Sequence, residues 1–339
     1  MTHEQYMARA LELAASVDLA RDVNPRVGAV IVSANGDVVG VGAHHGSGTD
    51  HAEVVAINEA GGATVGATLY ATLEPCNATG KRPPCVDAVI QAGITRVVIA
   101  QNDPNPAMAG GVARLREAGI EVITGLMSDE ATELNKSWTF AHLHNRTWVI
   151  WKTATTIDGF ITIAGADSPW ITCEESRQMV QTIRAGVGAI VTGTGTVMAD
   201  NPHLTVRAND ADDQPLRVVA GSRPIDPHAN VLQGPHPALL TSDDIGDVLT
   251  KLWREHGIHS VLIEAGQGLS SSVWAQNLVD EVYWFQAPTI AGDGIRVLGD
   301  IGVKTVEDIR RFSQIAVNRV GLDIVSHFLV TKDIACLPE

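Results

Sequence analysis

Hydrophobic and polar positions in the first half of the chain repeat with the periods of a mixed sheet covered by helices. Apolar positions recur roughly every 3.6 residues from Tyr6 to Ala20, which predicts an amphipathic helix that ends before Asn24-Pro25. Two apolar runs flank Asn35-Gly36, the strongest short signal of a β-hairpin. The strands predicted in this half are 27–32, 38–42, 67–73, 96–100 and 120–123. The predicted helices are 6–20, one opening at His51, one opening near Cys85, 111–118 and 128–140.

In the second half, short apolar runs alternate with helical patterns. The strands predicted here are 148–153, 189–192, 216–220 and 260–264, and the helices are 174–185, 246–256 and one after Gly266. Alternating strands and helices predict a parallel sheet. The polar segment 141–146 between the halves is predicted to be a linker, and metal binding by its His142 and His144 is the alternative.

Length, composition and charge narrow the class of protein. The 339 residues suffice for two domains that each bury a core, and 45% of the residues are hydrophobic. A net charge of −15, with only 24 Lys and Arg, argues against a nucleic-acid partner and favours a small-molecule substrate. No apolar run approaches the roughly 20 residues of a membrane-spanning helix, and residues 1–5 lack a secretion signal. We expect a cytoplasmic homo-oligomer in which Cys173 and Cys336 are ordinary reduced residues.

Three residues in the first half have the chemistry of zinc ligands. His51, Cys76 and Cys85 provide one imidazole and two thiolates, which leave a tetrahedral zinc ion one open position for water. Glu53 is not needed as a ligand, so its carboxylate can take a proton from the attacking water and return it to a leaving amine. This division of labour is typical of zinc deaminases.

The spacing of this motif leaves an alternative open. Zinc deaminases carry H-x-E followed by P-C-x-x-C. Here eight residues separate Cys76 from Cys85, and a histidine and two cysteines scattered through a domain can be packing residues. The predicted elements favour the metal, because His51 begins a helix and Cys76 follows a strand. Cys85 follows Pro83-Pro84, where proline can open a helix.

Glycine-rich turns predict a nucleotide site in the second half. The turns Gly266-Gln267-Gly268 and Gly193-Thr194-Gly195 each follow a strand and precede a helix. Glycine lets the backbone approach a pyrophosphate, although many such turns carry glycine for packing alone. Ser222-Arg223, after a third strand, can hold the 2′-phosphate that distinguishes NADP from NAD. The G-x-G-x-x-G fingerprint with its downstream acid is absent from the sequence, which argues against an ordinary Rossmann domain.

The insert between the two cysteines resembles that of one enzyme family. The run from Cys76 to Cys85 (CNATGKRPPC) is similar to the longer insert of the riboflavin-biosynthesis deaminase-reductases. The similarity covers nearly the whole chain and extends to 103–106, 109–110, 134–136, Lys152, 158–159, 170–172, 199–202, 204–207 and 264–266. The chain departs from the family at Asn77-Ala78, where the family usually has Ser-His, so contacts around the zinc loop are expected to differ there.

The resemblance implies a fold and a reaction for each half. Residues 1–145 are expected to form a zinc-dependent, cytidine-deaminase-like three-layer α/β domain, and residues 146–339 a dihydrofolate-reductase-like α/β domain. The first would hydrolyse the exocyclic 2-amino group of 2,5-diamino-6-ribosylamino-4(3H)-pyrimidinone 5′-phosphate. The second would reduce the ribosyl group of the product to ribityl with NADPH, giving 5-amino-6-ribitylaminouracil 5′-phosphate.

The resemblance also implies the residues of each site. Lys152, Asp200 and Glu264 would surround the reacting ribose. The substrate-binding residues would be Asn24, His44 and Lys81 in the first half and Ser168, Arg184, Leu204, Arg207 and Glu264 in the second. The cofactor-binding residues would be Thr155, Trp170, Thr196, Asp200, Ser222, Gly266, Gln267, Gly268, Leu269 and Ser270.

Two other classes of function stay open from the sequence. One is a nucleobase or nucleoside deaminase whose C-terminal half binds a nucleotide only as a regulator. The other is a non-catalytic binding protein that keeps the fold. The presence of Glu53 beside all three candidate ligands disfavours the second.

Overall fold

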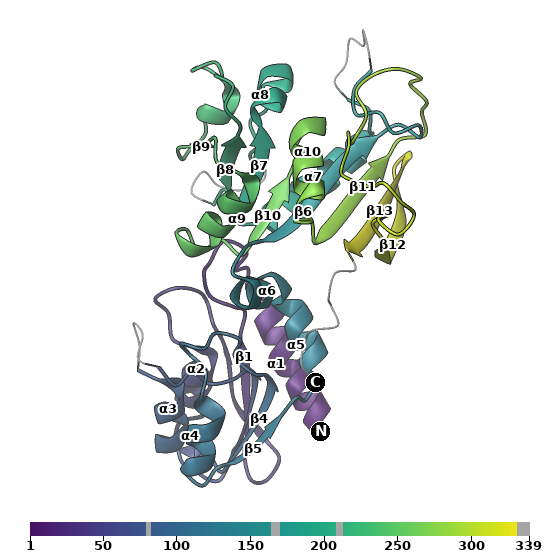
Figure 1. The fold of residues 1–339 in the computed structure, drawn as a ribbon. Coiled ribbons are helices and arrows are strands. Elements are labelled where there is room, and N and C mark those ends of the chain that lie inside the picture. Colours follow the sequence, from purple (N-terminus) through teal and green to yellow (C-terminus); the bar gives the residue numbers. More distant parts are fainter. Residues whose placement is uncertain (79–82, 164–169, 208–212, 331–339) are drawn as a thin grey trace. The chain divides into compact units, whose positions relative to one another are not determined.

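The computed structural model describes residues 1–78, 83–163, 170–207 and 213–330, and the chain divides into two compact units. The units are Met1–Asn145 and Arg146–Glu339, and each has its own sheet and its own core (Figure 1). Lys81, Ser168 and Cys336 lie outside the described residues.

The first unit is a five-stranded sheet between two layers of helices. The strand order is β2-β1-β3-β4-β5, in which β1 runs antiparallel to both neighbours and β3, β4 and β5 are parallel. The strands are β1 (Gly28–Val32), β2 (Val38–Ala43), β3 (Thr68–Leu73), β4 (Arg96–Gln101) and β5 (Glu121–Thr124). The helices are α1 (His3–Ala15), α2 (Ala52–Ala60), η1 (Gly61–Thr64), α3 (Cys85–Gln91), α4 (Gly111–Glu117), α5 (Ser128–Leu134) and α6 (Lys136–His144). α1 and α5 pack on one face of the sheet, and α2, α3 and α4 pack on the other.

Two glycines on β2 let α2 pack directly against the sheet. A Cβ on Gly40 would overlap the carbonyl oxygen of Ala56, and a Cβ on Gly42 would overlap that of Ala52. Ala52 and Ala56 are fully buried at this contact. Because backbone and small side chains interlock here without space to spare, the first turn of α2 has a fixed position against the sheet.

The opening helix is shorter than its apolar period predicts. α1 ends at Ala15, and the Asp18 side chain then accepts a hydrogen bond from Ala20 N (3.0 Å) in a local turn. Such short-range side-chain bonds compete with helix formation. Val17 and Leu19 are nevertheless buried, so their apolar character reflects burial beyond the end of the helix.

A tertiary contact breaks the helix predicted over 128–140. α5 and α6 meet at Asn135, whose side chain binds both backbone groups of Arg26. Its Oδ1 accepts a hydrogen bond from Arg26 N (2.9 Å), and its Nδ2 donates one to Arg26 O (2.8 Å). Asn135 therefore joins the two helices to a loop more than a hundred residues earlier in the chain.

The prediction of a linker over 141–146 is wrong, because most of this segment is helix. α6 continues to His144 and ends at Asn145, whose φ of 57° is left-handed. Two pairs of rings four residues apart stabilise this last turn. The ring centroids of His142 and Trp138 are 4.6 Å apart, and those of His144 and Phe140 are 4.2 Å apart.

The second unit is an eight-stranded sheet with the order β12-β13-β11-β6-β10-β7-β8-β9. The strands are β6 (Trp148–Thr155), β7 (Ala189–Gly193), β8 (Leu216–Ala220), β9 (Leu239–Thr241), β10 (Ser260–Ile263), β11 (Glu281–Gln286), β12 (Phe312–Val320) and β13 (Asp323–Val330). The helices are α7 (Glu174–Ala185), α8 (Thr194–Asp200), η2 (Asn230–Leu232), α9 (Ile245–Arg254) and α10 (Gln267–Ala275). α9 and α10 cover one face of the sheet, and α7 and α8 contact the other.

The prediction of a parallel sheet is correct for only part of this unit. Strands β11, β6, β10, β7, β8 and β9 are parallel, whereas β13 is antiparallel to both β11 and β12. β12 and β13 form a hairpin around Gly321 and Leu322, with Gly321 at a φ of 58°. No helix separates these strands in sequence, so the strand–helix alternation of the earlier segments does not extend to them.

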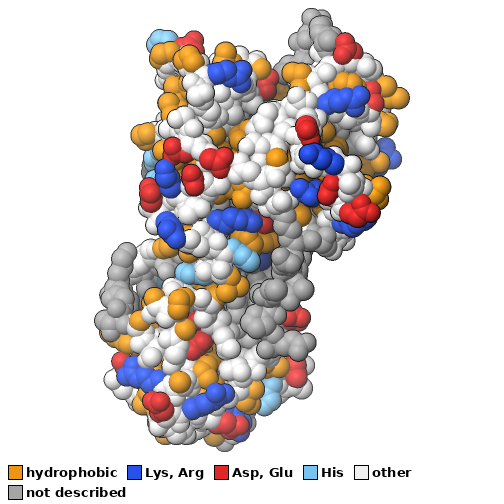
Figure 2. All heavy atoms as spheres, viewed as in Figure 1, with side chains coloured by type: hydrophobic (Ala, Val, Ile, Leu, Met, Phe, Trp, Pro, Cys, Tyr) orange, Lys and Arg blue, Asp and Glu red, His pale blue; other side chains and the backbone are white. Residues whose placement is uncertain are grey.

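Charged side chains are mixed on the visible surface. Lys and Arg are interspersed with Asp and Glu on the face drawn in Figure 2, and its described residues form no broad basic area. Among the described residues, no helix has both the length and the apolar character needed to span a membrane.

Candidate functional site

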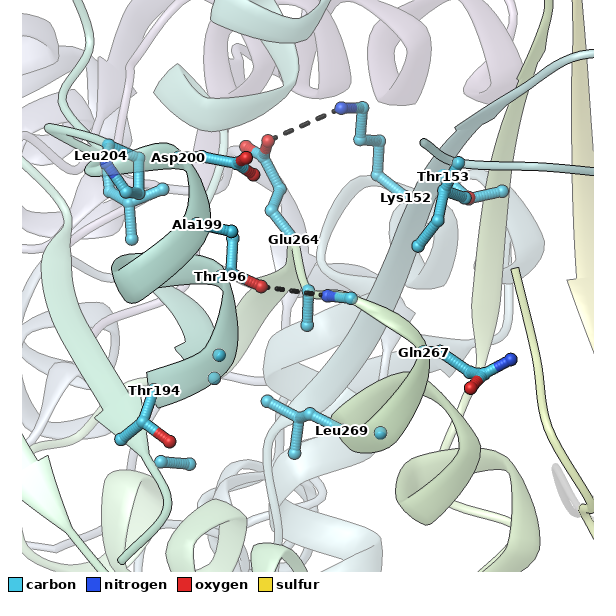
Figure 3. A pocket seen from close by; sticks show the side chains of 18 of the residues that line it. Lys152, Thr153, Thr194, Thr196, Ala199, Asp200, Leu204, Glu264, Gln267 and Leu269 are labelled. Carbon is cyan, nitrogen blue, oxygen red and sulfur yellow. Dashed lines mark hydrogen bonds and ion pairs between the residues drawn. The ribbon is translucent and has the colours of Figure 1, made fainter. Parts of the chain in front are cut away.

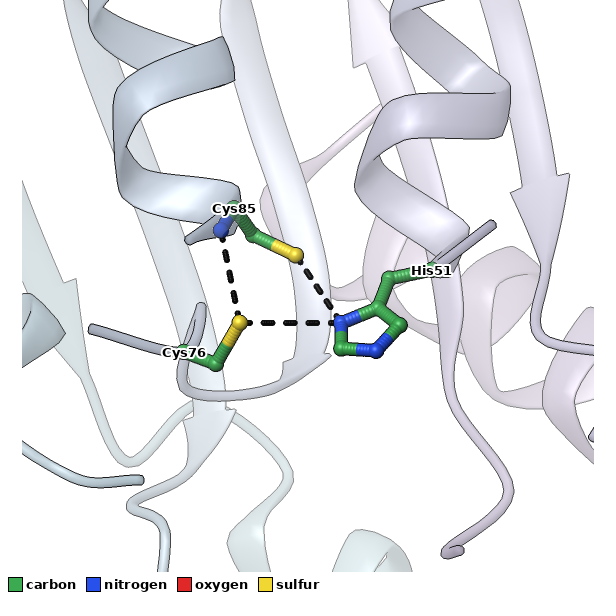
Figure 4. Close-up of side chains that lie close together, drawn as sticks. All are labelled: His51, Cys76 and Cys85. Carbon is green, nitrogen blue, oxygen red and sulfur yellow. Dashed lines mark hydrogen bonds between the residues drawn. The ribbon is translucent and has the colours of Figure 1, made fainter. Parts of the chain in front are cut away.

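The ends of three elements bring the predicted zinc ligands of the first unit together. His51 immediately precedes α2, Cys76 follows the C-terminal end of β3, and Cys85 is the first residue of α3. Figure 4 shows the three side chains pointing toward one another. Carboxyl ends of strands and starts of helices meet at this edge of the sheet, where α/β proteins commonly bind ligands.

The spacing of the donor atoms fits a single zinc ion. His51 Nδ1 lies 3.0 Å from Cys85 Sγ and 3.6 Å from Cys76 Sγ, and all three donors lie within 4.8 Å of one another. A tetrahedral zinc ion with bonds of about 2.3 Å to sulfur and about 2.0 Å to nitrogen separates such ligands by roughly 3.5 Å. The residues present therefore fit zinc, with three protein ligands and one position open.

The surroundings of Cys76 favour its thiolate form. Hydrogen bonds from Cys85 and then from His51 lower the pKa of Cys76 to about 4, although burial opposes this. The backbone N–H of Cys85 donates to Cys76 Sγ (3.3 Å). The hydrogen bond to Cys76 in turn raises the pKa of His51. A thiolate is the form of cysteine that binds metals, so the site is prepared for a cation.

Glu53 lies beside the cluster but outside the set of three donors. It is in the first turn of α2, and its side chain is only 3% exposed. Burial raises the pKa of Glu53 to about 7, against the opposing effects of the His51 charge and a hydrogen bond to Cys85. A carboxyl group that titrates near neutrality can both accept and return a proton.

Of the substrate residues expected in this unit, His44 lies at the cluster. Its ring is 5.2 Å from that of His51, and its Nε2 is buried without a hydrogen-bond partner among the described residues. Burial lowers the pKa of His44, which favours the neutral ring. Asn24 donates from Nδ2 to Ser47 (3.0 Å), in the loop that follows His44. Lys81 lies outside the described residues.

Asn77, where the chain departs from the family, links the zinc loop to two helices. Its Oδ1 accepts a hydrogen bond from Arg114 Nη1 of α4 (3.1 Å), and Arg114 also pairs with Asp87 of α3. Its backbone N–H donates to Met108 O (2.9 Å). Asn77, at a position where the family usually has serine, therefore links the loop after Cys76 to α4 and to Met108.

The histidines of α6 do not form a second metal site. In the part of the chain that the structure describes, His51, Cys76 and Cys85 are the only such group of three donors. His142 and His144 instead pack on aromatic rings of their own helix.

In the second unit, the carboxyl ends of β7, β8, β9 and β10 open into a cleft of about 1450 Å³. Pockets for drug-sized ligands measure roughly 300–1,000 Å³, so this one has room for a dinucleotide and a second molecule. The catalytic and substrate residues expected there that line it are Lys152, Arg184, Asp200, Leu204, Arg207 and Glu264. The expected cofactor residues that line it are Trp170, Thr196, Asp200, Ser222, Gly266, Gln267, Gly268 and Leu269.

A buried carboxylate is the charged centre of this cleft. Arg184 binds Glu264 with two hydrogen bonds, Nε to Oε1 (2.6 Å) and Nη2 to Oε2 (3.1 Å). Lys152 Nζ lies 3.5 Å from Glu264 Oε2, as Figure 3 shows. Burial opposes ionisation, but the charges of Arg184 and Lys152 outweigh it and lower the pKa of Glu264 to about 2. Glu264 is therefore ionised throughout the neutral range.

Protein groups contact the whole guanidinium of Arg184. Besides Glu264, its guanidinium donates from Nη1 to the carbonyl oxygen of Thr205 (3.1 Å). These contacts engage all of its nitrogens with protein groups. The expected binding of substrate by Arg184 stays a prediction.

The two glycine turns lie against each other at the floor of the cleft. Gly193 precedes α8 and Gly266 precedes α10. Thr196 Oγ1 accepts a hydrogen bond from Gly266 N (3.0 Å), which joins the turns (Figure 3). Arg223 lies over the first turn, because a Cβ on Gly195 would overlap its guanidinium. The two glycine turns and one cation therefore lie at the same end of the cleft, and a helix start can receive a phosphate.

Thr155 and Ser270 are not among the described residues that line the cleft, and their role as cofactor contacts stays a prediction. Thr155 is fully buried and accepts a hydrogen bond from Trp284 Nε1 (2.9 Å). Ser270 is buried within α10 and accepts one from Trp151 Nε1 (3.1 Å). Both hydroxyls thus accept hydrogen bonds from the indole N–H groups of tryptophans. Ser168 lies outside the described residues.

Arg177 also lines this cleft, although no sequence pattern predicts it. Its guanidinium carbon lies 5.2 Å from the centre of the Trp170 ring, and its Nη1 donates to Thr172 O (2.6 Å). Arg177 is an ordinary polar position of a helix in the sequence, so no spacing marks it. Its place in the cleft is apparent only from its contacts with Trp170 and Thr172, which precede α7.

Two family models match the chain, one in each half. The cytidine and deoxycytidylate deaminase zinc-binding region matches residues 1–101, and the RibD C-terminal domain matches residues 147–326.

Curated relatives align over nearly the full length. Riboflavin biosynthesis protein RibD of Aquifex aeolicus is 36% identical over 355 residues, covering 96% of this chain and 98% of the relative. The protein of the same name from Escherichia coli is 37% identical over 366 residues, covering 97% and 100%.

Solved structures agree with these matches. A structure of Acinetobacter baumannii RibD aligns with a TM-score of 0.87 at 34% identity, covering 97% of this chain and 98% of that one. A Thermotoga maritima structure described as a diaminohydroxyphosphoribosylaminopyrimidine deaminase/5-amino-6-(5-phosphoribosylamino)uracil reductase aligns with a TM-score of 0.80 at 32% identity, covering 96% and 98%.

The zinc cluster predicts a metal content that depends on Cys85. We expect about one zinc per chain in the purified protein and loss of that zinc in Cys85→Ala, because two remaining ligands cannot close the site. Metal analysis of the dialysed proteins measures this, with Cys173→Ala as the control that keeps its zinc. Full zinc occupancy in Cys85→Ala would contradict the assignment.

The charged centre of the cleft predicts a pH-dependent stability. Because the pKa of folded Glu264 is about 2, below its ordinary value of 4.5, its stabilisation is present at neutral pH and is lost as pH falls from about 4.5 toward 2. Glu264→Gln leaves two partly buried cations without their carboxylate partner and should cost about 3 kcal/mol at pH 7. That difference should shrink through this acidic window.

Urea unfolding followed by tryptophan fluorescence tests this, since six of the seven tryptophans lie in the second unit. The control is Glu174→Gln, which removes a half-exposed ion pair with Arg177 and should cost under about 1 kcal/mol. A constant difference between wild type and Glu264→Gln from pH 7 to pH 3 would refute the account.

Proposed function

The chain belongs to the RibD family of riboflavin biosynthesis proteins, and from that premise we propose that each half carries out one of two successive reactions. Residues 1–145 are the zinc-dependent deaminase domain and residues 146–339 the NADPH-dependent reductase domain. The first removes the 2-amino group of 2,5-diamino-6-ribosylamino-4(3H)-pyrimidinone 5′-phosphate. The second reduces the ribosyl group of that product, giving 5-amino-6-ribitylaminouracil 5′-phosphate.

One observation carries the proposal most directly. In one unit, three candidate zinc ligands lie beside Glu53, a buried carboxyl group that is not itself a ligand. In the other, a large cleft contains the charged group centred on Glu264. A non-catalytic binding protein has no need of Glu53 beside the cluster. A regulatory nucleotide site has no need of Lys152 and Arg184 converging on Glu264.

In the deaminase domain, His51, Cys76 and Cys85 would hold the metal. Zinc at that position would lower the pKa of the attacking water, which makes its nucleophilic hydroxide form available at neutral pH. Glu53 takes a proton from that water and passes it to the departing nitrogen, for which a pKa near 7 is well matched. His44, neutral and with a free buried Nε2, is available to bind a polar group of the pyrimidine.

In the reductase domain, the cleft orients a ribose between charged residues. NADPH supplies the hydride. Lys152 places a cation where negative charge develops during ring opening or hydride transfer, and Glu264 holds that cation in position. Asp200 and Arg207 line the same cleft and are the proposed contacts to the substrate. The guanidinium of Arg207 is the group suited to bind the substrate's phosphate.

The preference for NADPH is proposed to depend on Arg223. Ser222 and Arg223 follow β8 and line the end of the cleft formed by the glycine turns. A guanidinium beside backbone N–H groups suits a phosphate, and NADH lacks the phosphate that would occupy it.

We also propose that the protein works as a homo-oligomer in the cytoplasm. β12 is an edge strand on which Phe312, Ile315 and Val317 are 40–50% exposed, and a second copy would cover them. The free thiols Cys76 and Cys85 suit a reducing compartment. Sedimentation equilibrium tests the first statement, and a monomer at micromolar concentration would contradict it. Fractionation of cells tests the second, and export from the cytoplasm would contradict it.

The two-site account predicts that the activities can be lost separately. Glu53→Gln should keep zinc, lose deamination by about 10²–10⁴-fold, and still reduce an already deaminated substrate. Lys152→Ala should do the reverse, because the partners of its cation among the described residues, Glu264 and Phe285, lie in the second unit. Separate assays of each step measure this. Loss of both activities in a folded Lys152→Ala protein would mean that the domains share one composite site.

The cofactor proposal predicts a change in selectivity. Arg223→Ala should lower the ratio of kcat/KM for NADPH over NADH by about 10–100-fold, the worth of one charge-assisted hydrogen bond. Arg96→Ala, which removes a surface ion pair in the first unit, is the control and should leave the ratio unchanged. If Arg223→Ala also leaves it unchanged, the 2′-phosphate is bound elsewhere.

A further inference from the structure

Glu74, the residue before Pro75-Cys76, accepts hydrogen bonds from three backbone N–H groups of a distant segment. Its Oε1 accepts hydrogen bonds from Gly110 N (3.0 Å) and Val112 N (3.0 Å), and its Oε2 accepts one from Asp103 N (3.1 Å). The Glu74 side chain is 7% exposed. One buried carboxylate therefore fastens both ends of residues 103–112.

The same segment contacts the zinc loop on both sides of Cys76. A Cβ on Gly111 would overlap the carbonyl oxygen of Pro75, so the backbones touch there. On the other side, Asn77 N donates to Met108 O (2.9 Å). Glu74, Pro75 and Asn77 are thus all held by residues 103–112, and the chain carrying Cys76 has little freedom to move.

A carboxylate is the side chain that this arrangement requires. Ionised, it is purely an acceptor and can receive several N–H groups at two oxygens. Glutamine has the same shape but replaces one oxygen with an NH₂ donor, which would face a backbone N–H. A buried donor without an acceptor is costly, so one end of the segment should detach.

We propose that Glu74 is a positioning residue of the deaminase site: by fastening residues 103–112 against Pro75-Cys76-Asn77, it fixes Cys76 as a zinc ligand. Its role does not require contact with metal or substrate. This inference rests on the deaminase half of the proposed function. Partners outside the ligand set typically change metal affinity or activity by about 10–100-fold when they are replaced.

The test compares zinc-loaded wild type with Glu74→Gln in three assays. Hydrogen exchange should become faster at the amides of Asp103, Gly110 and Val112. Zinc release to a chelator should accelerate by about 10–100-fold, and kcat/KM for deamination should fall by a similar factor. Reduction of an already deaminated substrate should stay at the wild-type rate, which confines the effect to the first unit.

Two further variants separate positioning from general damage. Gly111→Ala displaces the same segment from Pro75 without touching Glu74, and it should reproduce the faster zinc release. Glu59→Gln is the control, because Glu59 Oε2 also accepts a backbone hydrogen bond, from Val41 N (2.7 Å), but at the far end of α2 from His51. It should match wild type in every assay.

The outcomes distinguish this inference from the proposed function. Faster exchange at the three amides with unchanged zinc release and deamination would overturn the positioning role and leave Glu74 purely structural. Unchanged exchange would overturn the contact itself. If wild type binds zinc but does not deaminate the pyrimidine, the proposed function fails, while exchange and zinc release still decide the role of Glu74.

Discussion

A charge removed from water must be compensated inside the fold, and both candidate sites depend on how this chain meets that requirement. In the first unit, the thiolate of Cys76 is compensated by hydrogen bonds from Cys85 and His51. In the second, Glu264 is compensated by Arg184 and Lys152. Each cluster lies where strands end and helices begin, so elements packed in the core supply side chains that are already aligned.

The two kinds of compensation suit two kinds of chemistry. The thiol and imidazole cluster of the first unit is short of positive charge and accepts a metal ion, and Glu53 stays outside it with a pKa near 7. The second unit compensates its carboxylate internally, with Arg184 and Lys152. That leaves a preorganised charged wall beside a cleft large enough for a dinucleotide. The first arrangement suits the proposed hydrolysis, and the second suits the proposed hydride transfer.

Much of this could be predicted from the sequence, because it depends on local patterns. The matched relatives and structures confirm the family resemblance and the fold class, and the structure brings His51 and both cysteines of the motif together. Contacts between distant side chains and backbones could not be predicted. The bond of Asn135 to a loop split one predicted helix, and the partners of Arg184 and Thr155 gave each a role that no spacing indicated.

The central claim is that one chain deaminates the pyrimidine and then reduces its ribose. The most direct measurement incubates the wild-type protein with the diaminopyrimidine ribosyl phosphate, with and without NADPH, and identifies products by mass spectrometry. Without NADPH, the account predicts only the deaminated ribosyl compound. With NADPH, it predicts the same compound carrying the mass of two additional hydrogen atoms. Failure to deaminate, or reduction of a product that keeps both amino groups, would contradict the account.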